Sequence, residues 1–122
     1  MTGRSAAALR PVTDWRNYFQ SSPIYTTERL GFPDKNKEAY RRSSPITYAD
    51  KLQRPVLILH GMVDDNVHVQ DSVQLIGKLI ELGKTNYFDA MLYPTENHAF
   101  TNAEAWADEY ERILELFDEN LK

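Results

Sequence analysis

Hydrophobic residues run without a break near the middle of the chain, where Val56 to Leu59 follow Pro55. The run ends at His60 and Gly61, and polar residues come directly after it. A short apolar run that contains branched side chains and closes on glycine predicts a strand buried on both faces. Such strands are typical of parallel sheets covered by helices, so this segment is expected inside a parallel sheet.

Two further strands are predicted, one before and one after this run. The first covers residues 6–12, because Pro11 excludes a helix interior there and most of its neighbours are apolar. The other covers residues 86–94 and ends at Pro94. Because these strands alternate with helices, we expect an α/β protein with a parallel sheet of about three strands flanked by helices.

Two helices are predicted from apolar residues at helical spacing. Residues 69–82 carry a broad apolar stripe and are followed by Gly83, the residue type most typical of the position after a helix. A last helix is predicted to start at the capping box from Thr101 to Glu104 and to keep one apolar face to the C-terminus.

Residues 13–52 form a long connection between the first two strands. The pattern predicts a helix over residues 13–20 with Thr13 as its N-cap. An irregular, aromatic-rich loop over residues 23–33 follows, then a short helix over residues 36–42 and one more helical turn. Long ordered connections with aromatic residues often form lids or pockets, although the rings can also simply pack the connection down.

Composition limits the classes that need to be considered. A chain of 122 residues suits one domain with one core. Its formal charge of −4 argues against a nucleic-acid or anionic-membrane partner. The chain has no cysteine, which excludes disulfides, thiolate metal sites and a thiol nucleophile. No apolar run reaches the ~18 residues of a membrane-spanning helix, and no compartment is predicted.

Candidate chemistry lies where two of the predicted strands end. Asp64 follows the central strand, and His98 follows the third strand 34 residues later. Neighbouring parallel strands open at one sheet edge, where α/β proteins place their sites. An aspartate that accepts from one ring nitrogen orients a histidine, whose other nitrogen can act as general base. Asp followed by His is also the order of the last two triad residues in α/β-hydrolases.

Other interpretations of these residues stay open at this point. Asp64 can be a turn residue and His98 a polar loop residue. Carboxylates and imidazoles also suit a divalent metal ion, which Asp64, Asp65, His68 and His98 could bind together. A non-catalytic binding module on the same scaffold would keep the aromatic connection without pairing the two residues. A hydrogen bond between His98 and Asp64 would favour the catalytic interpretation.

Several segments resemble one known family. The matching segments read PVTDWRNY, IYTTERLGFP, YRRSSPITYADKL, HGMVDDNV, HVQDSVQLIGKLIELGK and MLYPTENHAF. Together they closely resemble the C-terminal part of the prolyl oligopeptidase family of serine peptidases, above all its dipeptidyl peptidase IV and acylaminoacyl peptidase branches. The resemblance covers almost the whole chain from Ala6. It implies the C-terminal portion of an α/β-hydrolase fold, a peptide substrate, a Ser-Asp-His triad, and no cofactor or metal.

The resemblance also implies roles for individual residues. Asp64 matches the family's catalytic aspartate and His98 its catalytic histidine, while Asp65 is the neighbour of the triad member. Ala99 stands where the family more often has glycine. Six residues match positions that line the pocket for the residue before the cleaved bond, namely Val12, Trp15, Tyr18, Tyr25, Asn66 and Val67.

One part of the family's machinery has no counterpart in the sequence. The family's nucleophile lies in a G-x-S-x-G elbow ahead of the segment matching PVTDW, and no serine of this chain has that context. The chain is therefore expected to be a partial peptidase domain, without the elbow or the propeller, and inactive alone. Surfaces exposed by such truncation predict a homo-oligomer.

Overall fold

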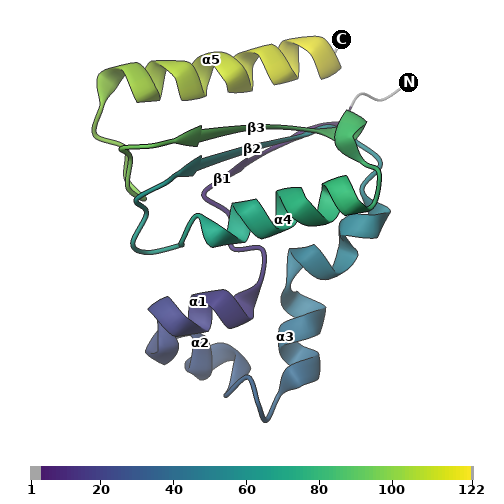
Figure 1. The fold of residues 1–122 in the computed structure, drawn as a ribbon, viewed down its shortest axis with the longest axis vertical. Helices are drawn as coiled ribbons and strands as arrows, with labels where there is room; N and C mark the ends of the chain where they lie inside the picture. The colour runs from purple at the N-terminus through teal and green to yellow at the C-terminus, as the bar shows by residue number, and fades with distance from the viewer. Residues whose placement is uncertain (1–3, 122) are drawn as a thin grey trace.

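The computed structural model describes residues 4–121 and shows a three-stranded parallel sheet between helices (Figure 1). The strands are β1 (Ala6–Leu9), β2 (Val56–Gly61) and β3 (Phe88–Tyr93), with β2 in the middle. Gly61 lies beside Tyr93 in the register, so β2 and β3 end at the same edge. The predicted α/β architecture is confirmed.

The two faces of the sheet are covered by different helices. Figure 1 shows α4 (Gln70–Glu81) on one side and α5 (Ala103–Asn120) on the other. Ile58 packs with Leu79 of α4, whereas Leu59 packs with side chains that include Trp106 of α5. Alternating side chains of β2 thus enter two cores, and each fully buried one contributes about 1.5–3 kcal/mol. No helix described in residues 4–121 is long and apolar enough to cross a membrane.

The connection between β1 and β2 forms a helical lobe, which Figure 1 shows beyond α4. Its elements are α1 (Trp15–Ser21), α2 (Pro23–Leu30), α3 (Lys37–Ser43) and the 3₁₀ helix η1 (Pro45–Lys51). Tyr40 of α3 is completely buried, and its hydroxyl donates to the carbonyl of Gly31 at 2.7 Å. The lobe is therefore an ordered unit with its own buried anchor.

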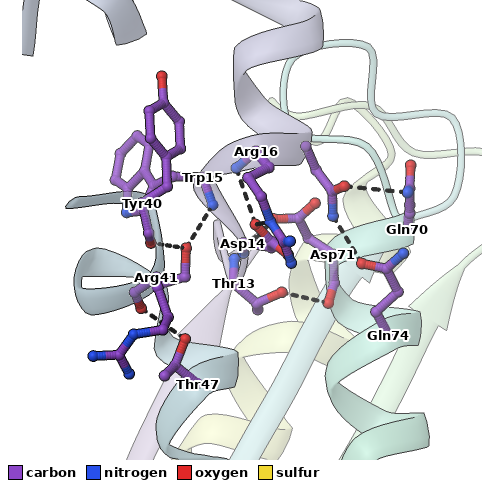
Figure 2. A network of polar contacts seen from close by, with 12 residues as sticks. Thr13, Asp14, Trp15, Arg16, Tyr40, Arg41, Thr47, Gln70, Asp71 and Gln74 are labelled. Atoms are coloured by element: carbon purple, nitrogen blue, oxygen red, sulfur yellow. Dashed lines mark hydrogen bonds and ion pairs between the residues drawn. The ribbon is translucent and has the colours of Figure 1, made fainter. Parts of the chain in front are cut away.

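Hydrogen bonds tie the base of this lobe to α4 (Figure 2). The buried carboxylate of Asp71 accepts from the backbone N–H of Thr13 at 2.8 Å and of Asp14 at 3.2 Å. Thr13 Oγ1 donates back to the Asp71 carbonyl at 2.7 Å. The residue after α3 returns to the same place, because Trp15 N–H donates to Ser44 Oγ at 2.9 Å. The start of α1 and the end of α3 are thus fixed at one point.

The prediction of an irregular loop within the lobe was wrong. The irregular loop expected over residues 23–33 contains the helix α2, which Pro23 begins. Proline suits the first helical position because the missing N–H has no partner there in any case. Gly31, at a φ of 70°, then ends α2.

The N-cap of α1 is Asp14 and not Thr13, which binds Asp71 instead. The Asp14 side chain accepts from the backbone N–H of Arg16 at 3.0 Å. Burial of this carboxyl opposes ionisation, but hydrogen bonds and the charge of Arg16 outweigh it and lower the pKa of Asp14.

Other boundaries lie close to the predicted ones. The helix expected over residues 69–82 is α4, and Gly83 follows it at a φ of 70°. The strand expected from residue 86 begins at Phe88, after a 3₁₀ turn, η2 (Thr85–Tyr87). The last helix is capped by Asn102, whose side chain accepts from two backbone N–H groups, so the capping box from Thr101 was one residue early.

Arg10 ends β1 earlier than the predicted residue 12 and joins the strand to α5. Its φ of 50° turns the chain out of the sheet, and its N–H donates to the Leu59 carbonyl at 2.7 Å. The guanidinium lies 4.5 Å from the Phe100 ring centre and 3.5 Å from the Glu109 carboxylate. Burial raises the pKa of Glu109, and the charge of Arg10 opposes that rise.

Candidate active site

Two loops meet where β2 and β3 end: the aspartate loop, residues 62–69, and the histidine loop, residues 94–102. Asp64 is buried in the first of them. Its Oδ1 accepts from the backbone N–H groups of Asn66 and Val67, each at 2.9 Å. These two bonds fix the plane of the carboxylate and direct its second oxygen, Oδ2, to the histidine loop.

His98 lies within hydrogen-bond distance of Asp64. Its Nδ1 is 2.8 Å from Asp64 Oδ2, and its side chain is 40% exposed. A carboxylate can only accept, so Nδ1 carries a proton, and in the neutral ring Nε2 then keeps its lone pair. The pair thus presents a basic nitrogen at a partly open surface, with its ring orientation set by a buried acid.

His60 lies behind Asp64 and is completely buried. Its Nε2 is 2.7 Å from the Val67 carbonyl and 3.4 Å from Asp64 Oδ2, and its Nδ1 is 2.7 Å from Ser72 Oγ. A carbonyl can only accept, so Nε2 donates and Ser72 donates to Nδ1. Burial lowers the pKa of His60 despite its bond to Val67 and the nearby Asp64. The ring is neutral and supports the aspartate loop through its hydrogen bond to the Val67 carbonyl.

This burial predicts a pH dependence of folding. The pKa of His60 is lower in the folded chain, so below about pH 6.5 the unfolded chain binds more protons. Stability should fall on acidification through that pH, by up to about 1.4 kcal/mol per pH unit from this group. Urea unfolding between pH 7.5 and 5 measures it. His60→Gln should flatten the slope, whereas His68→Gln, with His60 intact, should keep it; equal slopes in all three chains would contradict the assignment.

Glu96 holds the histidine loop in place, a role that was not predicted from the sequence. Its buried carboxylate accepts from the backbone N–H of Thr101 at 2.8 Å and of Asn102 at 3.1 Å. Its carbonyl accepts from Val63 N–H of the aspartate loop at 3.2 Å. Only the capping pattern of the next helix, which needs acceptors at this end, could have suggested such a partner.

The candidate pocket residues form an aromatic cluster beside the aspartate loop. The rings of Trp15 and Tyr18 meet edge to face at 5.6 Å, and those of Tyr18 and Tyr25 at 6.1 Å. Tyr18 Oη donates to Asn66 Oδ1 at 2.9 Å, which links the cluster to the loop of Asp64. Four of the six predicted residues are therefore in contact.

The other two candidates have different places. Val67 is buried, and its backbone N–H holds the Asp64 carboxylate. Val12 lies half buried between β1 and α1. Asp65 and His68, the further candidate metal ligands, are exposed. Within residues 4–121, no three His, Asp or Glu side chains are grouped so that they could hold a metal ion.

A parallel sheet covered by helices, with an aspartate and a histidine paired at the ends of adjacent strands, defines the α/β-hydrolase class. The model of the prolyl oligopeptidase family matches residues 4–122. The chain belongs to this family.

Relatives and solved structures agree with this assignment. A dipeptidyl-aminopeptidase B of Aspergillus niger is 40% identical over 108 residues, which are 87% of this chain and 11% of that protein. A protein named as a probable dipeptidyl-aminopeptidase B of Coccidioides posadasii is 43% identical over 100 residues, 79% of this chain and 10% of its own length. The crystal structure of Porphyromonas gingivalis dipeptidyl peptidase 4 matches with a TM-score of 0.88 and 31% identity over 96% of this chain and 16% of that one. The chain thus spans about a tenth of the length of these curated relatives.

Proposed function

We propose that this chain supplies the aspartate and the histidine of the Ser-Asp-His triad of a serine peptidase. The observation that carries the proposal is the 2.8 Å contact between Asp64 Oδ2 and His98 Nδ1. His98 Nε2 takes the proton of a serine hydroxyl as that oxygen attacks the peptide carbonyl, and returns it to the leaving amine. Asp64 stabilises the imidazolium that forms between these steps. A non-catalytic binding module would not need this pairing.

The aromatic cluster is proposed to receive the residue before the cleaved bond. Trp15, Tyr18 and Tyr25 present ring faces and edges next to the loop of Asp64, and such surfaces suit proline or a small apolar side chain. Asn66 offers a polar group beside the rings to a substrate carbonyl. The names of the relatives, dipeptidyl-aminopeptidase and dipeptidyl peptidase, support removal of dipeptides as the reaction.

The nucleophile is proposed to come from outside these 122 residues, whose serines lack the elbow context. The chain is then one partial peptidase domain that completes an active site together with a further part of a larger protein. The edge of β1 that faces away from β2 is the surface that such a part would cover. Self-association through that edge stays a prediction.

A chimera tests this proposal. Placing the chain in the position of the matching segment of Porphyromonas gingivalis dipeptidyl peptidase 4 joins its Asp64 and His98 to a complete enzyme scaffold. The chimera should hydrolyse a chromogenic dipeptide substrate with proline before the cleaved amide, whereas the 122-residue chain alone should not exceed the buffer rate. Turnover by the chain alone would overturn the assignment of the nucleophile. A chimera that melts cooperatively but is inactive would overturn the roles of Asp64 and His98.

A further inference from the structure

Asn97 joins the aspartate loop to the histidine loop through a single oxygen atom. Its Oδ1 accepts from the backbone N–H of Asp65 at 3.0 Å and from the backbone N–H of His98 at 2.7 Å. Both partners are donors, so the atom between them is the amide oxygen. One donor directly follows Asp64 and the other belongs to His98 itself, so this oxygen lies between the two members of the catalytic pair.

We propose that Asn97 is a positioning residue that sets the separation of Asp64 and His98; this inference rests on the proposed function of the pair. Both hydrogen bonds of the Asn97 oxygen go to backbone N–H groups. Asn97 acts through the two backbones, and the Asp64–His98 hydrogen bond acts on the ring. Asn97 holds the backbone of His98 and Asp64 holds its ring, and together they fix the direction of Nε2.

The remaining links between the loops do not provide this hold on the His98 backbone. Met62 N–H donates to the Tyr93 carbonyl at 2.8 Å, and Val63 N–H donates to the Glu96 carbonyl at 3.2 Å. The two donors lie before Asp64 in the aspartate loop, and the two acceptors lie before His98, at the end of β3 and in the histidine loop. Without the Asn97 oxygen, the backbone of His98 could shift while these links stayed intact. A catalytic group must be held within about 0.5 Å of its productive position, so the extra link has a catalytic consequence.

Chemistry favours a neutral amide over a carboxylate at the position of Asn97. An aspartate in place of Asn97 could accept the same two hydrogen bonds. Its charge, however, would be added to that of Asp64 in the same loop region and would favour the charged form of a nearby imidazole. An amide oxygen positions the two loops without adding charge. This difference provides a conservative variant that keeps the geometry.

NMR of the 122-residue chain tests the proposal through the His98 ring and two backbone amides. In Asn97→Ala, the low-field signal of the His98 Nδ1 proton should broaden or disappear, because the bond to Asp64 loosens. The amides of Asp65 and His98 should exchange with solvent at least about fivefold faster, as expected for the loss of one hydrogen bond each. Asn97→Asp should restore the Nδ1 signal and the protection of both amides.

A matched control separates this effect from a general loss of stability. Asn86 is exposed in η2 and makes none of these contacts. Asn86→Ala should leave the Nδ1 signal and both amides unchanged. If Asn97→Ala melts the whole chain, the comparison between Asn97→Asp and the parent decides, because a folded Asp variant without the Nδ1 signal overturns the proposal. An Asn97→Ala chain with an unchanged signal and unchanged amides also overturns it.

The outcome is distinct from the test of the proposed function. An inactive but folded chimera would reject the catalytic roles of Asp64 and His98, whatever the NMR of the chain shows. An active chimera whose Asn97→Ala variant keeps its full kcat would reject the positioning role alone. When both hold, Asn97→Ala should lower kcat more than it raises KM, and Asn97→Asp should recover most of the loss.

Discussion

Asp64→Asn should lower the kcat of the active chimera about 10⁴-fold, which is the loss of rate expected when the histidine of a triad has the wrong tautomer. In the parent chain, Oδ1 accepts from Asn66 and Val67 N–H, and Oδ2 faces His98 Nδ1. An asparagine must keep its oxygen on the two backbone donors, so its NH₂ group faces Nδ1. His98 Nδ1 then accepts from this NH₂ group, and the ring proton moves to Nε2. A protonated Nε2 cannot act as the general base.

Asp65→Asn is the matched control for this prediction. It makes the same chemical change at the neighbouring carboxylate, which is exposed. Its kcat should stay within about twofold of the parent chimera, in line with a surface substitution. Nitrogen chemical shifts of His98 in the 122-residue chain give an independent measurement, because they should show the tautomer exchanged in Asp64→Asn alone. A tautomer that does not change would refute the mechanism even if the rate falls.

Gly61→Ala should destabilise the chain by about 3 kcal/mol, at the upper end for overpacking, and disrupt the Asp64–His98 pair at the same time. A Cβ at this position would lie 2.2 Å from the Glu96 carbonyl oxygen and 2.9 Å from that of Asn97. Both atoms belong to the backbone and cannot rotate away. The histidine loop must therefore move, and a shift of about 1 Å can cost about 10²-fold in rate.

Gly77→Ala is the control for Gly61→Ala. Gly77 lies within α4, and a Cβ there would meet nothing within 4 Å. Alanine should therefore stabilise the chain by about 0.5–1 kcal/mol, because it has the higher helix propensity. Urea unfolding measures both variants, and the His98 Nδ1 proton signal reports on the site. A Gly61→Ala chain as stable as its parent, with that signal intact, would show that the two loops are not packed as described.

Local patterns were sufficient for the elements that carry the core. The apolar run after Pro55 predicted β2, and helical spacing before Gly83 predicted α4, because burial requires these patterns in any sheet covered by helices. The pattern failed where one residue type serves two purposes. Pro23 is a typical loop residue but begins α2, and Thr13 is a typical helix cap but its hydroxyl donates to the backbone carbonyl of Asp71, 58 residues away.

The residues of the candidate site also fall into those that the sequence predicted and those that it did not. Asp64 and His98 could be proposed because a motif places them directly after strands. Tyr18 could be proposed from the resemblance, but its bond to Asn66 could not, since it joins residues 48 positions apart. The roles of Glu96 and Asp71 were missed because each carboxylate binds backbone N–H groups, which leave no mark on the sequence of the partner. Such roles depend on tertiary structure alone.

The closed base of the helical lobe has a consequence for how this family can vary. Thr13 and Ile46 are hydrogen-bonded to each other across the base, and Trp15 is hydrogen-bonded to Ser44, so the segment that contains α1, α2 and α3 begins and ends at one point. A longer or shorter excursion closed in this way costs little loop entropy and does not move the ends of β1 and β2. Residues can therefore be inserted into or deleted from the lobe, and its aromatic surface reshaped, without displacing Asp64 and His98. Under the proposed function, substrate preference and catalytic power could then change independently of each other.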